Sequence, residues 1–276
     1  MLNIADQDFK RLVDFVKSNY GIDLSKKRQL ISSRLSGTVA SMGYKDFTGY
    51  VDHIVSKKSG KDNEIMLNKL TTNYTYFYRE KAHFDFFRDT ILPYVVENKQ
   101  KNRVMSIWSA GCSSGEEPYT ITMLIKEYLG AQASSWDTRI LATDISHDVL
   151  SKAKTGLYEE ESLRELPPEW KRKYFTPVKE APGTYEVSKA LRSNVIFRTF
   201  NLMDPIQFKL KFDVIFCRNV MIYFDQDTKE ALVKRFYQAS NPGAYLLIGH
   251  SESLNKDRTP YEYLMPATYR KIEGNI

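Results

Sequence analysis

The stretch SAGCSSGEEPY, residues 109–119, decides the expected fold of this chain. It follows the apolar run RVMSIWSA, residues 103–110, and precedes an amphipathic stretch, residues 117–129, that is expected to form a helix. Gly111 and Gly115 permit the tight turn and the close ligand approach that a loop between a strand and a helix requires. The stretch therefore predicts a ligand-binding loop at the carboxyl end of the first strand of an α/β sheet.

Short apolar runs continue to alternate with helical stretches after this loop. The expected strands are RVMSIWSA, RILATD, NVIFRTF, FDVIFC, AYLLIGH and TYRKI, and the expected helices span 117–129, 147–154 and 227–239. This alternation predicts a mostly parallel, doubly wound sheet. A connection of about 38 residues, from Gly156 to Ser193, interrupts it, although such connections ordinarily have ~2–6 residues. Because Pro182-Gly183 separates KYFTPVKE from TYEVS as a hairpin turn would, we expect a small β-subdomain inserted at about residues 157–193.

The first 70 residues are expected to form a separate, small all-α domain. Phe9, Leu12 and Val16 have the spacing of one helical face, and residues 1–70 show no alternation typical of a strand. Residues 71–102 also have a helical pattern and join this domain to the sheet domain.

The composition excludes several classes of protein. Of the 276 residues, 42% are apolar and 13% aromatic, which is enough for a folded core and argues against intrinsic disorder. Cys112 and Cys217 alone make no disulfide framework, and no Cys/His cluster suggests structural zinc. The opening residues lack the apolar run of a signal peptide, and no stretch is apolar enough to span a membrane, so a cytoplasmic location is expected.

The positive charge is concentrated at the start of the chain. The net charge is +6, and residues 1–70 contribute 12 basic and 8 acidic residues, a net of +4. A basic first quarter indicates an acidic partner, either a nucleic acid or an acidic protein surface.

Asp144 ends the second expected strand, where its carboxylate could accept hydrogen bonds from both hydroxyls of a ribose. This position favours a nucleotide or S-adenosylmethionine site. Asp144 lies 29 residues after Gly115, beyond the ~20 of the dinucleotide fingerprint, which argues against a nicotinamide enzyme. Alternatively, Asp144 simply caps the helix expected at 147–154.

The glycine loop also permits a different interpretation, the nucleophile elbow of a hydrolase. Gly111-Cys112-Ser113-Ser114-Gly115 matches the pattern G-x-S-x-G, and Asp225 and His250 follow Ser113 in the required order. The pattern is short and chance matches are common.

Two further segments bring polar residues toward the same edge of the sheet. LTTNYTYFYRE, residues 70–80, combines poor helix formers with Arg79, a composition that suits a polar lid over a ligand. FDVIFCRNVMIYFD, residues 212–225, delivers Arg218 and Asn219 to the carboxyl edge. Enzymes that methylate amino groups of nucleic-acid bases usually carry Pro-Pro and an aromatic residue here, so the sequence argues against that class.

These motifs together resemble one family. TTNYTYFYR, SAGCSSGEEPY, ATDIS, FRTFNLMD, FDVIFCRNVMIYFD and GHSES, in this order, resemble the chemotaxis receptor methyltransferases of the CheR family. The resemblance implies methyl transfer from S-adenosylmethionine to glutamate side chains in the Glu-rich helices of methyl-accepting chemotaxis receptors. It implies a Rossmann-like methyltransferase sheet in residues 103–276, with the lid segment in 71–102. No metal, nucleic-acid partner or membrane insertion is expected.

The resemblance also assigns site residues. The cofactor contacts of the family fall on Asn73, Thr75, Arg79, Glu117, Asp144, Asn201, Leu202, Arg218 and Asn219. Arg79 and Tyr223 match the two polar side chains nearest the transferred methyl group, which makes them the candidate catalytic residues. A nucleic-acid methyltransferase and the Ser113 hydrolase remain the alternatives.

A basic strip in the first domain is the candidate receptor-docking site. Lys26, Lys27 and Arg28 follow Ser25, the expected N-cap, and would lie in the first turn of a helix. The helix dipole disfavours cations there, so their placement suggests a function other than helix stability. Arg34 would extend the strip two turns beyond Lys27, and such a strip could steer Glu-rich receptor helices.

Overall fold

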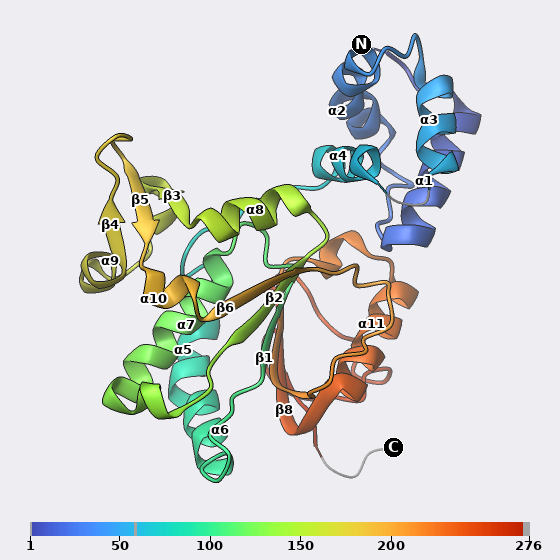
Figure 1. Cartoon of the computed structure of the whole chain (residues 1–276). Coiled ribbons are helices and arrows are strands. Elements are labelled where there is room, and N and C mark those ends of the chain that lie inside the picture. Colours follow the sequence, from blue (N-terminus) through green and yellow to red (C-terminus); the bar gives the residue numbers. More distant parts are fainter. Residues whose placement is uncertain (1, 58–59, 273–276) are drawn as a thin grey trace.

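A computed structural model describes residues 2–57 and 60–272 of the chain (Figure 1). Within these residues, four helices form an N-terminal domain that stands beside an α/β domain (Figure 1). They are α1 (Asp6–Tyr20), α2 (Arg28–Ser41), α3 (Phe47–Ser56) and α4 (Lys61–Leu70). No helix in the described ranges combines the length and the apolar character needed to cross a bilayer.

Helix α1 shows how the first domain forms from its sequence. Asp6 and Asp8 lie in its first turn and Lys17 in its last, so the charges complement the helix dipole. Gly21 then adopts a left-handed conformation, with φ of 74°, and its N–H closes the helix on the carbonyl of Lys17. The apolar face that includes Leu12 is buried, which docks α1 into the core of the domain.

The α/β domain has a seven-stranded sheet in the order β6-β2-β1-β7-β8-β10-β9. The strands are β1 (Ile107–Ala110), β2 (Ile140–Asp144), β6 (Val195–Thr199), β7 (Phe212–Cys217), β8 (Ser240–Ile248), β9 (Glu262–Met265) and β10 (Thr268–Arg270). The first five strands in this order pair in parallel, and β10 and β9 are antiparallel. The doubly wound sheet predicted from the sequence is confirmed, although β9 was not among the expected strands.

Alternate residues of the central strands face two separate cores. Ile107 and Phe216 belong to the core beneath α7 (Glu116–Leu129), and Trp108 and Ile215 to the core beneath α11 (Gln226–Ala239). Figure 1 shows α7 and α11 on opposite sides of the sheet. Both β1 and β7 are buried throughout, as expected of strands covered on both faces.

The interruption after the second helix of the sheet domain, α8 (His147–Thr155), is a small antiparallel sheet. Its order is β3-β5-β4, formed by β3 (Leu157–Glu159), β4 (Phe175–Pro177) and β5 (Thr184–Val187). Two short helices, α9 (Pro168–Tyr174) and α10 (Lys189–Arg192), accompany it (Figure 1). The β-subdomain and the hairpin turn at Pro182-Gly183 thus match the expectation.

The helical pattern expected throughout 71–102 is wrong for its first ten residues. Helix begins only at α5 (Lys81–Phe86), which continues through a π-helical turn (Phe87–Ile91) into α6 (Leu92–Asn98). Residues 71–80 are non-helical, with a turn near their end, and other elements satisfy part of their backbone: the N–H of Phe77 donates to the Ser162 carbonyl at 3.0 Å. The Tyr78 N–H donates to the Thr120 hydroxyl at 3.2 Å. We call residues 71–80 the lid segment.

The N-terminal domain contacts the α/β domain just beyond β7. Ile22 forms an isolated antiparallel bridge with Phe224, and the Asp23 N–H donates to the Tyr223 carbonyl at 2.8 Å. Lys17 forms an ion pair with Asp225 at 2.6 Å. These contacts bring the end of α1 to the carboxyl edge of the sheet.

Candidate functional site

A pocket opens at the carboxyl ends of β1, β2 and β7. The chain runs from β1 to β2 on one side and later returns to β7 on the other, so this is the point where strand order reverses and where open α/β sheets bind ligands. Every predicted cofactor-binding or catalytic residue lines it: Asn73, Thr75, Arg79, Glu117, Asp144, Asn201, Leu202, Arg218, Asn219 and Tyr223. The structure therefore brings together residues that span 151 positions of the sequence.

Asp144 is held at the end of β2 by backbone donors. Its carboxylate accepts the N–H of Ser113, from the glycine loop, at 2.9 Å and the N–H of Ser146 at 3.0 Å. Burial raises the pKa of Asp144, and these N–H donors oppose that shift. The cap of α8 is Ser146, whose hydroxyl accepts the N–H of Val149 at 3.3 Å, so the alternative reading of Asp144 as the helix cap is wrong.

The glycine loop packs closely against the segment after β7. A Cβ atom at Gly111 would lie 2.4 Å from a methyl carbon of Val220, and the φ of Gly111 is 80°. Any other residue would therefore clash and strain the loop. Glycine at position 111 therefore lets the loop after β1 pack directly against the segment after β7 at the pocket.

Arg218 is the charged centre of this edge, with a side chain that is only 2% exposed. Its guanidinium donates to Glu117 at 3.0 Å and to Glu80 at 3.0 Å, and also to the Arg79 carbonyl. Glu117 additionally accepts the Ser109 hydroxyl at 2.7 Å. Because its donors are shared among these partners, Arg218 organises the pocket wall from β7 to the lid segment.

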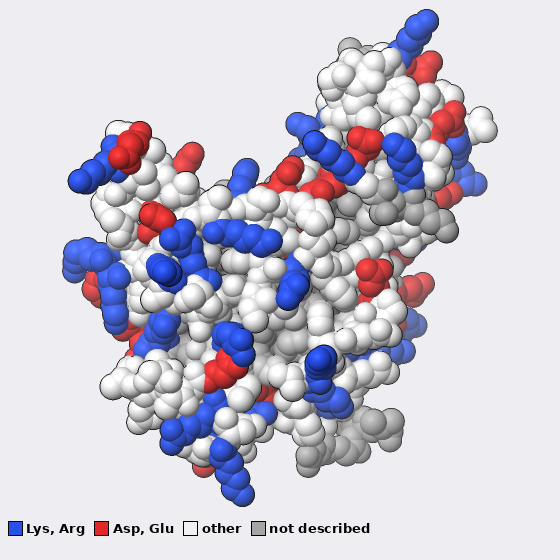
Figure 2. Space-filling view, in the orientation of Figure 1, with Lys and Arg blue, Asp and Glu red and all other residues white. Residues whose placement is uncertain are grey.

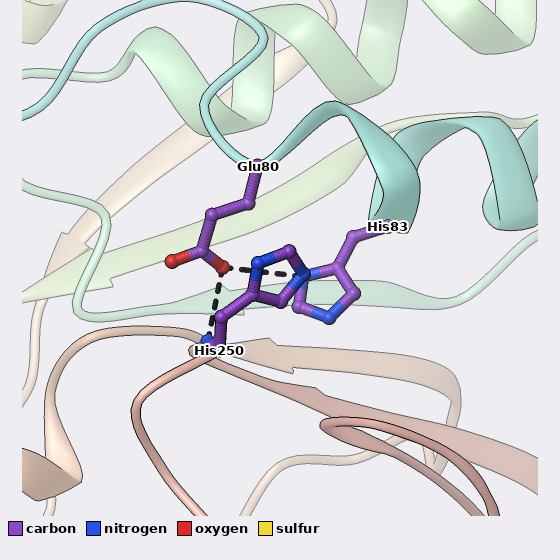
Figure 3. A group of neighbouring side chains, drawn as sticks. All are labelled: Glu80, His83 and His250. Carbon is purple, nitrogen blue, oxygen red and sulfur yellow. Dashed lines mark hydrogen bonds and ion pairs between the residues drawn. The ribbon is translucent and has the colours of Figure 1, made fainter.

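Glu80 and two histidines form a compact group beside Arg218 (Figure 3). Their potential ligand atoms lie within 4.8 Å of one another, as in many metal sites. However, the Arg218 Nε–H donates to His83 Nδ1 at 3.1 Å, and Arg218 also donates to Glu80. His83 Nδ1 and one oxygen of Glu80, two of the three potential ligands, thus already face a guanidinium. Burial lowers the pKa of His83, which favours the neutral acceptor that this bond requires.

The lid segment is tied to the pocket rim through its carbonyl groups. The Ser113 hydroxyl donates to the Asn73 carbonyl at 3.0 Å, and Arg79 donates to the Tyr74 carbonyl at 2.8 Å. The Tyr223 hydroxyl donates to the Thr72 carbonyl at 3.3 Å. Of the two candidate catalytic residues, Arg79 thus belongs to the lid segment and Tyr223 is hydrogen-bonded to it.

The hydrolase alternative is wrong, because its three residues do not meet. The Ser113 hydroxyl donates to a backbone carbonyl. Asp225 caps α11 and pairs with Lys17, while the His250 ring packs against the His83 ring at a centroid distance of 4.3 Å. No Ser–His–Asp relay can form from these positions.

Family models match nearly the whole chain. The model described as "CheR methyltransferase, SAM binding domain" matches residues 73–270, and that described as "CheR methyltransferase, all-alpha domain" matches residues 7–71. The chain belongs to the CheR methyltransferase family. It is an S-adenosylmethionine-dependent methyltransferase of chemotaxis, and the nucleic-acid alternative has no support.

Curated relatives agree with this assignment. The chemotaxis protein methyltransferase of Borreliella burgdorferi is 44% identical over 98% of this chain and 96% of that protein. Chemotaxis protein methyltransferase Cher2 of Pseudomonas putida is 36% identical over 92% of this chain and 93% of its own length. The Escherichia coli chemotaxis protein methyltransferase is 34% identical over 92% of this chain and 87% of its own.

The basic strip expected on the second helix of this CheR-family chain does not form as predicted. Helix α2 begins at Arg28, so Lys27 rather than Ser25 occupies the N-cap position, and the Ser25 N–H donates to the Asp23 carboxylate at 3.0 Å. Lys26 and Lys27 therefore precede the helix on an exposed turn. The helix dipole argument applies to Arg28 alone.

The two arginines of the strip already have partners within the helical domain. Arg28 forms an ion pair with Asp6 and lies over the Phe9 ring at 4.8 Å. Arg34 donates to the carbonyls of residues 69, 70 and 71 at 3.1–3.4 Å, and so closes the C-terminal end of α4. On the face that Figure 2 shows, basic and acidic side chains alternate over this domain rather than forming one positive field.

Sequence reasoning missed residues that support or line the site. Tyr20 and Ile22 of the helical domain line the pocket, and no local motif announces them. Glu252, in the motif GHSES, accepts the backbone N–H groups of Asn219 at 3.0 Å and Ile222 at 2.9 Å. The motif GHSES contains Glu252, but the role of Glu252 as an anchor of the segment after β7 depends on contacts that only the folded chain makes.

Proposed function

We propose that this methyltransferase esterifies glutamate side chains of chemotaxis receptors, and that it does so in the cytoplasm. The observation that carries the proposal is the convergence of the family's motif residues on a single pocket at the switch point of the sheet. Relatives named chemotaxis protein methyltransferases, at 34–44% identity over most of the chain, support the same activity.

The pocket residues suit the binding of S-adenosylmethionine. The carboxylate of Asp144, fixed by Ser113 and Ser146, can accept hydrogen bonds from ribose hydroxyls. Glu117 also lines the pocket and offers a carboxylate suited to an ammonium group. Bound there, the cofactor supplies a methyl group that is already electrophilic.

The reaction needs alignment more than proton transfer. A glutamate side chain with a pKa of ~4.3 is ionised at neutral pH, so no general base is required. The chain's task is to hold a carboxylate in line with the methyl group, an orientation effect that is worth up to ~7–11 kcal/mol. Arg79 offers a fork of donors for a carboxylate, and Tyr223 offers one hydroxyl near the pocket mouth. Arg79 lies in the lid segment and Tyr223 is hydrogen-bonded to it, so the lid segment links the two residues.

The three parts of the chain then have separate roles. Residues 1–70 dock the receptor, residues 71–102 carry the lid segment, and residues 103–276 hold the cofactor. Lys26 and Lys27 remain the exposed cations for docking, because Arg28 and Arg34 have partners within their own domain.

The experiment that tests this function is incubation of the protein with methyl-labelled S-adenosylmethionine and receptor-containing membranes. We expect label on the receptor that mild base releases as methanol, which identifies a carboxyl methyl ester. Receptor in which the target glutamates are replaced by alanine is the control and should stay unlabelled. Base-stable label, or no transfer by a protein that binds S-adenosylhomocysteine, would contradict the proposal.

A further inference from the structure

Glu80 ends the lid segment and lies against the carboxyl edge of the central sheet. Its side chain is 15% exposed, and donors from two strand ends surround its carboxylate. Arg218 Nη2 and Asn219 Nδ2, after β7, each donate at 3.0 Å. The His250 backbone N–H, after β8, donates at 3.2 Å (Figure 3). One carboxylate thus joins the lid segment to two neighbouring strands.

The backbone on either side of Arg79 is strained. Tyr78 and Glu80 have φ of 64° and 60°, a region that non-glycine residues rarely adopt. Ser113 and Asn219, which also lie at this pocket, have φ of 49° and 59°. Such conformations cost energy and persist where surrounding contacts determine them, frequently at functional sites. Holding Arg79 between two strained residues therefore requires an anchor.

The charge of Glu80 suits that anchor. Burial would raise the pKa of Glu80, but the surrounding donors, among them Arg218 and Asn219, lower it well below its usual range. The side chain is therefore a carboxylate at all ordinary pH values, and hydrogen bonds to a charged acceptor are the stronger kind.

We propose that Glu80 is a positioning residue, which holds the strained turn at residues 78–80 against the sheet edge and so aims Arg79 into the cofactor pocket. The inference rests on the proposed function, in which the lid segment covers the bound cofactor. Glu80 acts through Arg79, whose carbonyl is also held by Arg218. Loss of the carboxylate would release the lid segment while leaving the glycine loop and Asp144 in place.

The test compares two glutamates of similar exposure. Glu80→Gln removes the negative charge at the end of the lid segment. Glu230→Gln removes the negative charge of a carboxylate on α11 that is 18% exposed, pairs with Arg258 and does not line the pocket. Backbone hydrogen exchange, measured by mass spectrometry, reports on the lid segment directly. The amides of Phe77 and Tyr78 are hydrogen-bonded and should exchange slowly in the unaltered protein.

We expect Glu80→Gln to speed exchange in peptides from residues 72–80 while β1 peptides stay protected, and to weaken S-adenosylhomocysteine binding by roughly tenfold to a hundredfold. Glu230→Gln should change neither. Unchanged lid exchange in Glu80→Gln, or a uniform increase over the whole chain, would overturn the positioning role. If the unaltered protein binds no S-adenosylhomocysteine while Glu80→Gln still loosens the lid segment, the positioning role stands and the proposed function fails.

Discussion

The pocket edge and the helical domain differ in how their candidate residues behave on folding. At the pocket edge, residues from five separate motifs meet in one cavity. In the helical domain, the expected basic strip separates: Lys26 and Lys27 lie on a turn, whereas Arg28 and Arg34 serve their own domain. The pocket residues and the basic strip are both predicted from short motifs, so the different outcomes need a physical explanation.

The difference comes from what each prediction depended on. Residues that follow parallel strands share one edge of the sheet whatever the exact strand length, so small errors in boundaries do no harm. Residues share a helical face only if all of them lie within the helix, because successive side chains then point about 100° apart around its axis. Because α2 begins at Arg28 and not at Lys26, Lys26 and Lys27 lie before the helix and share no helical face with Arg34. Site predictions that rest on topology are more robust than those that rest on helical phase.

The largest expected effect tests how tightly the pocket edge is bound together. Arg218→Met leaves the partly buried Glu80 and Glu117, 15% and 13% exposed, without their cation, which should lower the free energy of unfolding by about 3–5 kcal/mol and abolish S-adenosylhomocysteine binding. Denaturant unfolding and calorimetry measure the two effects. The control is Arg258→Met, which breaks an exposed pair and should cost about 0–1 kcal/mol. Similar losses of stability in both variants would contradict the proposal that Arg218 holds the pocket edge together.

The second effect concerns the cofactor itself. Asp144→Ala should weaken S-adenosylhomocysteine binding by about 1.5–3 kcal/mol, because a carboxylate aimed at the ribose is lost. Titration calorimetry on the folded variant measures the change. Asp148→Ala, which removes an exposed carboxylate four residues later on α8, should leave binding unchanged. Equal affinity in the Asp144 variant and the unaltered protein would move the ribose site elsewhere.

The third effect separates two adjacent carboxylates in the first turn of α7, Glu117, which lines the pocket, and the buried Glu116. Glu117 has Arg218 as its partner, whereas the described partner of the buried Glu116 carboxylate is only the Ser114 hydroxyl, at 2.8 Å. Burial raises the pKa of Glu116 to about 7. The folded protein thus keeps a proton that the unfolded chain releases above its own pKa of about 4.3, so stability falls as the pH rises from there to about 7.

In Glu116→Gln the side chain no longer titrates, so this pH dependence of stability should disappear. We expect the variant to gain about 2 kcal/mol over the unaltered protein between pH 5 and pH 8. Denaturant unfolding at the two pH values measures it. Parallel pH profiles for the two proteins would show that Glu116 is already ionised in the folded state.

The smallest expected effect lies in the helical domain and tests whether its exposed lysines contribute to receptor docking. Reversing Lys26 and Lys27 to Glu should raise the KM for receptor by about twofold to fivefold, while S-adenosylhomocysteine affinity stays constant. The change should shrink with added salt, because exposed charges are screened over about 8–10 Å at physiological ionic strength. Arg34→Glu is a poor substitute, since it would also open the end of α4. Methylation kinetics insensitive to both the reversal and the salt would exclude docking through this turn.

Much of the fold and most of the candidate site could be derived from local patterns. The alternation of apolar runs and helices implied the doubly wound sheet, the glycines at 111 and 115 implied the loop, and polar residues after buried runs implied the pocket edge. These inferences worked because each depends on a few neighbouring residues and on the rule that parallel strands end together.

Other features depended on contacts between distant parts of the chain. The lid segment is held in a non-helical conformation because Ser162 and Thr120 accept two of its N–H groups, and Tyr20 reaches the pocket because Ile22 pairs with Phe224. Glu80 becomes a partly buried, hydrogen-bonded carboxylate only when β7 and β8 bring Arg218, Asn219 and His250 around it. Local pattern decides which residues a segment offers, but hydrogen bonds and charges are satisfied by partners that only the tertiary structure supplies.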